Sequence, residues 1–407
     1  MILARYRHLT TWLTTAIACV AGSAATASGQ AIVVGTRAEY SIKSAKLGET
    51  RTVYVVPALH DAENANRHPV LVILDAEDGF QFAAAVANIA FLSSRGEIPP
   101  LIVVGVPNGK DRTHDLTPRP SRRTASSNRT AGGAAATSSF IVDEVLPLVR
   151  SKYRTEPTTL LAGHSFGGLF AVHIAATRPD VFNGVIAMSP ALWWNESTAA
   201  SAYADSIAAI RTPLRLFATS GGIEPAIDAS TRRFAARLDS LKPANVGFAY
   251  KRYPDDVHEV TPVTSLVDGL RFIFAPLSLN RVPVLGIRKG DSAVVVNAFV
   301  ATQRSYARAA GDLRLSQTAL PEEFVNNIGY AVLRELRLPR VAAWIFRQNV
   351  AVYPDSPNVY DSLGDALLAS GDRPGARVEF QRSIDVSLRL KRPVDAETRR
   401  KLRAVSK

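Results

Sequence analysis

The sequence has almost no cysteine. Its 407 residues include one, Cys19, inside an apolar N-terminal stretch that we expect to be removed. The remaining chain would then have neither a disulfide nor a reactive thiol. Zinc sites built from cysteine clusters are excluded, and the seven histidines show no ligand spacing. We therefore expect no bound metal ion.

Long, uninterrupted apolar runs are also missing. The longest candidate begins at Trp12, follows Arg5 and Arg7, and is thinned by threonine, glycine and serine before it reaches residue 25. A membrane-spanning helix needs about 20 firmly apolar residues. Residues 25–27 instead offer the small side chains that signal peptidase accepts. We interpret residues 1–27 as a secretory signal cleaved near Ala27, with lipoprotein processing at Cys19 as the alternative. The mature protein is expected to be secreted or periplasmic, without a membrane span.

Acidic residues are outnumbered, and the formal net charge is +12. Residues 382–407 carry nine Lys/Arg against three acids, and residues 110–130 carry six against two. No aromatic residue follows Phe380, so the basic end lacks the stacking side chains that nucleic-acid binding uses. We expect residues 391–407 to form a solvated, partly frayed basic tail, and we expect no nucleic-acid partner.

Strand-like and helix-like segments alternate through the first two thirds of the chain. A continuous apolar run typical of a buried parallel strand occurs at residues 69–75, another buried strand is expected at 101–106, and further strands are expected at 184–189 and 214–219. Segments with helical spacing separate them. Because such crossovers are right-handed, this order predicts an α/β domain, a mostly parallel sheet with helices on both faces, over residues 31–277.

A Gly-x-Ser-x-Gly motif is centred on Ser165. An apolar run enters it at residue 160, and an apolar helix leaves it. This context predicts a nucleophile elbow, in which a strand turns sharply into a helix and exposes the serine hydroxyl above the sheet edge. A side chain on either glycine would collide in so tight a turn. The motif and the alternating elements together predict an α/β-hydrolase fold.

An elbow serine needs a base and an acid, which follow it along the chain in the order acid, then base. Only His173 and His258 follow Ser165, and His173 lies about two turns along the elbow helix, roughly 12 Å away. His258 is therefore the expected base. Glu224 lies closest to the end of the strand at 214–219, and we expect it to be the acid. Asp228, one turn further, and a serine–histidine pair without an acid are the alternatives.

Backbone N–H groups would complete the site as an oxyanion hole. We expect them from Phe166, directly after the serine, and from Ala76, in the turn after the strand at 69–75. Arg112 lies in the basic segment, and Trp193 and Trp194 follow a strand end. We expect these three side chains to form a cationic rim and an aromatic wall around the substrate.

The C-terminal part has a different pattern. Ala342 and Ala376 are 34 residues apart, as are Phe346 and Phe380, which resembles tetratricopeptide repeats. Small residues beside bulky ones are what stacked helical hairpins need. We expect helical repeats over residues 315–390, a linker over residues 278–314, and a possible peptide or protein partner on the concave face of the repeats.

Several segments together resemble the "Putative esterase" (esterase D-like) family of α/β-hydrolases, nearest its periplasmic trilactone-siderophore esterases. The segments are residues 70–75, 111–118, 163–168, 189–194 and 254–261. The resemblance implies a serine ester hydrolase that acts on a small-molecule ester through an acyl-enzyme and needs no cofactor. An acyltransferase, a thioesterase and a peptidase are rivals within this fold. A repeat-based binding module with a vestigial hydrolase domain is the rival from another class.

Overall fold

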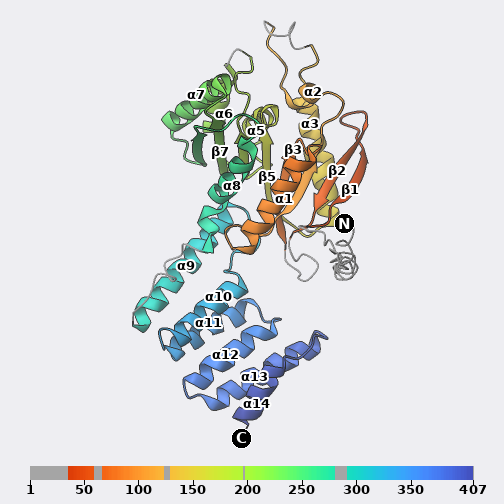
Figure 1. Ribbon diagram of the computed structural model, residues 1–407. Coiled ribbons are helices and arrows are strands. Elements are labelled where there is room, and N and C mark those ends of the chain that lie inside the picture. Colours follow the sequence, from red (N-terminus) through yellow and green to blue (C-terminus); the bar gives the residue numbers. More distant parts are fainter. Residues whose placement is uncertain (1–34, 59–66, 123–128, 196–197, 280–290, 407) are drawn as a thin grey trace, which may run out of the picture. The chain divides into compact units, whose positions relative to one another are not determined.

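The computed structural model describes residues 35–58, 67–122, 129–195, 198–279 and 291–406. The predicted signal peptide, residues 1–27, lies outside these ranges. An α/β domain is followed along the chain by an all-helical region (Figure 1). Within the described ranges, no helix is both long and apolar enough to cross a membrane.

One eight-stranded sheet forms the centre of the α/β domain, with the strand order β1-β2-β4-β3-β5-β6-β7-β8. Strand β1 pairs antiparallel with β2, and β2 pairs antiparallel with β4, whereas all the other pairs are parallel. The predicted α/β-hydrolase fold is confirmed. The strands are β1 (Ala38–Lys43), β2 (Thr50–Val56), β3 (His68–Leu74), β4 (Ile102–Val106), β5 (Thr155–His164), β6 (Gly184–Met188), β7 (Leu214–Gly221) and β8 (Val246–Tyr253).

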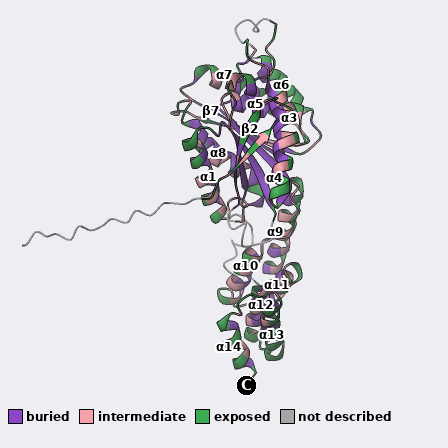
Figure 2. Cartoon of the chain, turned by 90° about the vertical axis from the view of Figure 1, so that its right-hand side faces the viewer, coloured by how far each residue is buried: buried purple, intermediate pink, exposed green. Residues whose placement is uncertain are grey.

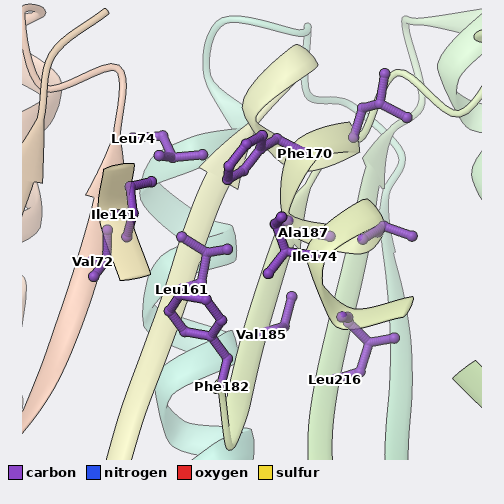
Figure 3. Close-up of a cluster of buried hydrophobic side chains, with 14 of the residues drawn as sticks. Val72, Leu74, Ile141, Leu161, Phe170, Ile174, Phe182, Val185, Ala187 and Leu216 are labelled. Carbon is purple, nitrogen blue, oxygen red and sulfur yellow. The ribbon is translucent and has the colours of Figure 1, made fainter. Parts of the chain in front are cut away.

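Side chains of the central strands alternate between two apolar clusters, one on each face of the sheet. In β3, Val70, Val72 and Leu74 enter one cluster, and Leu71 and Ile73 enter the other. Because both faces are covered, every residue of β3 is buried, which explains its continuous apolar run. The burial of the sheet is visible in Figure 2, and part of the first cluster is drawn in Figure 3.

Helices cover the two faces unequally. Helices α1 (Gly79–Ser94) and α8 (Thr261–Phe274) pack on the face that buries Leu71. The other face is covered chiefly by α3 (Ala134–Phe140), the π-helical turn η2 (Ile141–Val145), α4 (Leu146–Lys152), α5 (Phe166–Thr177), α6 (Thr198–Ala208) and α7 (Pro225–Leu241). The described part of this domain also contains the short helix α2 (Arg112–Leu116) and the 3-10 turn η3 (Ala275–Leu277).

The helical region repeats one packing arrangement. Its helices are α10 (Glu322–Arg334), α11 (Pro339–Val352), α12 (Pro357–Ala369) and α13 (Arg373–Arg389). A Cβ on Gly329 of α10 would overlap the ring of Phe346 on α11, and a Cβ on Gly364 of α12 would lie 2.5 Å from the ring of Phe380 on α13. In each hairpin a glycine therefore lets a buried phenylalanine lie against the backbone of the partner helix. The tetratricopeptide assignment itself stays a prediction.

The predicted linker, residues 278–314, contains a helix that the sequence analysis did not place. Helix α9 (Ser292–Asp312) contributes Phe299 to the apolar cluster of the helical region. Ala310, near its other end, joins the cluster of the α/β domain that includes Ile273. Just after α9, Ser316 donates its backbone N–H to Glu156 Oε2 at 2.7 Å. This connection is a packed element.

The basic tail needs a correction. Instead of fraying, residues within 391–407 form α14 (Ala396–Val405), and Val405 is buried in the cluster of the helical region. Lys401 Nζ lies 2.6 Å from Asp361 Oδ2 and 2.8 Å from Asp365 Oδ2 on α12. Asp361 and Asp365 therefore neutralise the charge of Lys401 and help to hold α14 against α12.

Candidate active site

The chain turns at Ser165, between β5 and α5, as the elbow motif predicted. Ser165 has a φ of 61°, the left-handed region in which a residue other than glycine is strained. A Cβ on Gly163 would overlap the carbonyl group of Gly167, so this crossing of strand and helix requires glycine. Neighbouring backbone holds the turn: the Ser165 N–H donates to Met188 O at 3.0 Å, and the Ala191 N–H donates to Ser165 O at 3.0 Å.

His258 and Glu224 lie together, although 34 residues separate them. His258 Nδ1 is 2.5 Å from Glu224 Oε2. Because an ionised carboxylate can only accept, Nδ1 carries the hydrogen and Nε2 of a neutral imidazole is left as an acceptor. That is the tautomer a general base needs in order to take a proton from a serine hydroxyl.

The Glu224 carboxylate is buried, with 7% of the residue exposed. Burial raises its pKa, but hydrogen bonds from His258, from the Ser189 hydroxyl and from the Gly221 N–H outweigh that effect and lower the pKa below its ordinary value. Glu224 is thus held as a carboxylate, the form that can orient and stabilise a histidine that takes up a proton.

Asp228 faces other partners. Its Oδ1 accepts from the Ser220 hydroxyl at 2.7 Å and from Arg252 Nε at 3.2 Å. Its Oδ2 lies 3.3 Å from Arg232 Nε. Of the two acids that the sequence left open, the structure brings Glu224 to His258 and leaves Asp228 in a separate ionic cluster on α7 and β8.

His164 places His258 beside the elbow. The two imidazole rings are 4.3 Å apart between centroids, and His164 directly precedes Ser165. Burial, with the nearby His258 as a second cause, lowers the pKa of His164 to about 4. His164 is therefore neutral near neutral pH and can lie against His258 without charge repulsion.

The two expected oxyanion donors come from neighbouring turns. Phe166 is the first residue of α5, where a backbone N–H has no acceptor within the helix. Ala76 is buried and follows Asp75, whose φ is 57°. A Cβ on Gly167 would lie 3.0 Å from Asp75 Oδ2, so the turn after β3 lies against the start of α5. The residue before Ala76 therefore contacts the residue after Phe166.

Arg112 does not stand free at the rim. Its Nε lies 2.6 Å from Asp75 Oδ1, and its Nη2 lies 2.9 Å from Asp75 Oδ2. Nη2 also donates to the carbonyl oxygen of His164 at 3.1 Å. The guanidinium charge is therefore already paired. Arg112 ties the turn after β3 to the residue before Ser165.

The two tryptophans differ. Trp193 is 40% exposed and its ring lies 5.9 Å from that of Phe166, so it can still line a substrate pocket next to the elbow. Trp194 is 1% exposed and packs in the core with its ring edge-on to Phe166. The predicted substrate contact by Trp194 is corrected to a core role, because a side chain with so little exposed surface cannot reach a ligand.

Three residues of the site were not predicted: Asp75, His164 as the neighbour of His258, and Ser189. Asp75 and Ser189 directly follow strands β3 and β6, whose carboxyl ends lie at the same sheet edge as Ser165. Their positions directly after strands were the sequence signal that could have predicted their closeness to Ser165. Within the described ranges, no group of three or more His, Cys, Asp or Glu side chains could hold a metal ion.

Comparison with known proteins identifies the domain. Residues 44–237 match the model of the family described as "Putative esterase". The matched residues lie within the α/β domain. The esterase D-like resemblance read from the sequence motifs is thereby confirmed.

Curated relatives carry related names. A "Siderophore triacetylfusarinine C esterase" of Aspergillus fumigatus is 34% identical over 141 residues, which are 31% of this chain and 45% of that protein. The "Ferri-bacillibactin esterase BesA" of Bacillus subtilis is 29% identical over 143 residues, 32% of this chain and 50% of that protein. The chain thus spans about half the length of the curated relatives it matches.

Solved structures share the fold. An IroE-like serine hydrolase from Shewanella oneidensis has a TM-score of 0.65 at 22% identity and covers 78% of this chain and 100% of its own. An uncharacterised protein from Capnocytophaga ochracea has a TM-score of 0.61 at 14% identity and covers 91% of this chain and 99% of its own. The second likeness extends over most of the chain, so it includes helical residues beyond the esterase-family domain.

Proposed function

We propose that this chain is a serine ester hydrolase in which Ser165 is the nucleophile, His258 the general base and Glu224 the acid. The observation that carries the proposal is the 2.5 Å contact between His258 Nδ1 and Glu224 Oε2 next to a nucleophile elbow. The esterase-family match of residues 44–237 supports an ester as the substrate.

The residues suggest the following steps. Ser165 Oγ bonds to the carbonyl carbon of the ester while its proton passes to His258 Nε2. The carbon–oxygen bond to the alcohol then breaks, and His258 returns the proton to the departing alcohol oxygen. A water molecule then bonds to the carbonyl carbon of the acyl-enzyme while its proton passes to His258. The bond to Ser165 Oγ breaks, the proton returns to Ser165, and the carboxylic acid product is released. Backbone N–H groups of Phe166 and Ala76 would stabilise the oxyanion formed in each half.

A bulky ester is the proposed substrate class. Relatives whose printed names are siderophore esterases support it. The exposed face of Trp193 beside Phe166 offers an aromatic wall near the nucleophile. A cationic site for an anionic substrate has less support than the sequence suggested, because the Arg112 guanidinium is paired with Asp75.

A labelling experiment tests the nucleophile. A fluorophosphonate probe should label the full-length protein once per chain, and Ser165→Ala should abolish labelling while leaving thermal unfolding unchanged. His258→Ala should lower kcat by several orders of magnitude, because an unactivated hydroxyl is a poor nucleophile near neutral pH. Labelling that survives in Ser165→Ala would contradict the proposal.

Export is a separate proposal. We infer that residues 1–27 direct the chain out of the cytoplasm and are removed near Ala27. N-terminal sequencing of the exported protein tests this. A mature chain that still begins at Met1, or a lipid-modified chain that begins at Cys19, would contradict it.

A further inference from the structure

The segment at the end of β6, residues 188–191, contacts two of the three proposed catalytic residues, Ser165 and Glu224. The Ser165 N–H donates to the Met188 carbonyl, and the Ser165 carbonyl accepts from the Ala191 N–H. Between those two positions, the Ser189 side chain contacts the acid, Glu224. Its Oγ lies 2.6 Å from Glu224 Oε1.

A second hydroxyl, that of Thr261, lies beside the Ser189 hydroxyl and bonds the base. Ser189 Oγ lies 2.9 Å from Thr261 Oγ1, and the Thr261 hydroxyl donates to the backbone carbonyl of His258 at 3.0 Å. Since the Glu224 carboxylate can only accept, the single hydrogen of the Ser189 hydroxyl belongs to Glu224. The Thr261 hydrogen is likewise given to the His258 carbonyl, so Ser189 bonds the acid and Thr261 bonds the backbone of the base.

Both oxygens of the Glu224 carboxylate are thereby occupied. Oε1 accepts from the Ser189 hydroxyl and from the Gly221 N–H, and Oε2 faces His258. Rotation of the carboxylate about its last bond would break both contacts of Oε1. The two donors to Oε1 thus fix the direction in which Oε2 points.

The backbone at Ser189 shows why a hydroxyl is useful here. Its φ is 43°, in the left-handed region that suits glycine better than serine. The residue is fully buried, so exposure to water does not favour a polar side chain. What serine adds at this strained position is its hydrogen bond to a buried charge, which is among the stronger kinds in proteins.

We propose that Ser189 is a positioning residue, whose hydroxyl holds the Glu224 carboxylate toward His258 while the backbone on either side holds Ser165. This rests on the proposed ester hydrolysis. The segment 188–191 then sets the nucleophile and the acid in one arrangement.

The charged groups nearby do not replace this contact. On the far side of His258 lies His164, which is neutral near pH 7, and beyond it the paired Asp75 and Arg112. On α7, Asp228 is paired with arginines. The Ser189 hydroxyl is thus the side chain, besides His258, that lowers the pKa of Glu224 against the effect of burial.

The test uses Ser189→Ala and Ser189→Gly in the full-length protein. Both remove the hydroxyl, but glycine also relieves the left-handed backbone. Ser230→Ala is the matched control, because Ser230 is also fully buried but bonds carbonyl groups within α7. We expect both Ser189 variants to lower kcat by about tenfold to a hundredfold on a short-chain aryl ester, with little change in KM. Ser230→Ala should keep its kcat.

Two readouts separate positioning from general stability. Removing a donor raises the pKa of Glu224, so the acid limb of the pH–rate profile should move to higher pH in both Ser189 variants and stay in place in Ser230→Ala. The downfield proton resonance of the His258–Glu224 hydrogen bond should shift or broaden in the same two variants. Wild-type kcat and an unmoved acid limb in Ser189→Ala would overturn the proposal.

The proton resonance also distinguishes this proposal from the proposed function. If the wild type fails to hydrolyse esters and is not labelled at Ser165, the ester hydrolase proposal fails. A resonance that changes in Ser189→Ala would still show that Ser189 positions Glu224. A resonance identical in the wild type and in both Ser189 variants would show that it does not.

Discussion

Replacing Arg112 by alanine tests whether this residue binds the substrate or holds the residues of the site in place. The change removes a bidentate salt bridge with Asp75 and a hydrogen bond to the His164 carbonyl. Asp75 precedes Ala76, and His164 precedes Ser165, so the lost contacts join the two turns from which we expect the oxyanion donors. The structure therefore predicts a loss that does not depend on the charge of the substrate.

The size of the effect follows from burial. The Asp75 side chain is 12% exposed and that of Arg112 is 36% exposed, so the pair lies between an exposed and a buried ion pair. Asn108 Nδ2, at 2.6 Å, would still donate to Asp75 Oδ1 in the variant. We expect the free energy of unfolding to fall by about 1–3 kcal/mol, above the value for exposed pairs and below that for breaking a fully buried one. Misplacing an oxyanion donor should lower kcat by about tenfold to a hundredfold.

The assay compares kcat/KM for a neutral and an anionic ester that share one leaving group, at low and high salt. Arg112→Ala should lose the same factor on both esters, and urea unfolding should show the lost stability. Arg119→Ala removes a cation from the same basic segment and is the matched control. A loss confined to the anionic ester, and shrinking as salt rises, would refute the bracing role and restore Arg112 as a substrate contact.

Three further predictions concern the acid, the pH dependence of stability and the helical region. Glu224→Gln should lower kcat strongly with little change in KM, whereas Asp228→Asn should be mild; the reverse ranking would make Asp228 the acid, and small, equal effects would favour a serine–histidine pair. Folding lowers the pKa of Glu224, so its ionised form stabilises the protein above the unfolded-state pKa, and this stability is lost as pH falls through the folded-state pKa. The difference in unfolding free energy between wild type and Glu224→Gln should therefore shrink toward acid pH. Gly364→Ala would place a Cβ 2.5 Å from the buried ring of Phe380 and should destabilise the helical region by about 1–3 kcal/mol in urea unfolding followed by circular dichroism. Gly311→Ala is its control, since a Cβ there meets nothing within 4 Å, and equal unfolding midpoints for the two variants would contradict the packing argument.

Local pattern was enough to predict the sheet and the elbow. A parallel strand buried on both faces must be apolar throughout, so β3 and β4 stand out in the sequence. The elbow is equally local, because its glycines and Ser165 lie within five residues. Helix α9 was missed although its buried residues lie on one stripe, because several of them are small or polar, as Thr302 and Ala309 are, so the apolar pattern that marks an amphipathic helix is weak.

Position at a strand end predicts closeness to the site but not the direction of a side chain. Trp193 and Trp194 are adjacent, follow the same strand, and differ from 40% to 1% in exposure because successive side chains leave the backbone on different sides. Arg112 shows the same limit for charge, since its partner Asp75 lies 37 residues earlier and only the fold brings them together. The net charge of a loop therefore does not show which of its cations remain available to a ligand. That is decided by the carboxylates that the sheet places against them, as Asp75 does for Arg112.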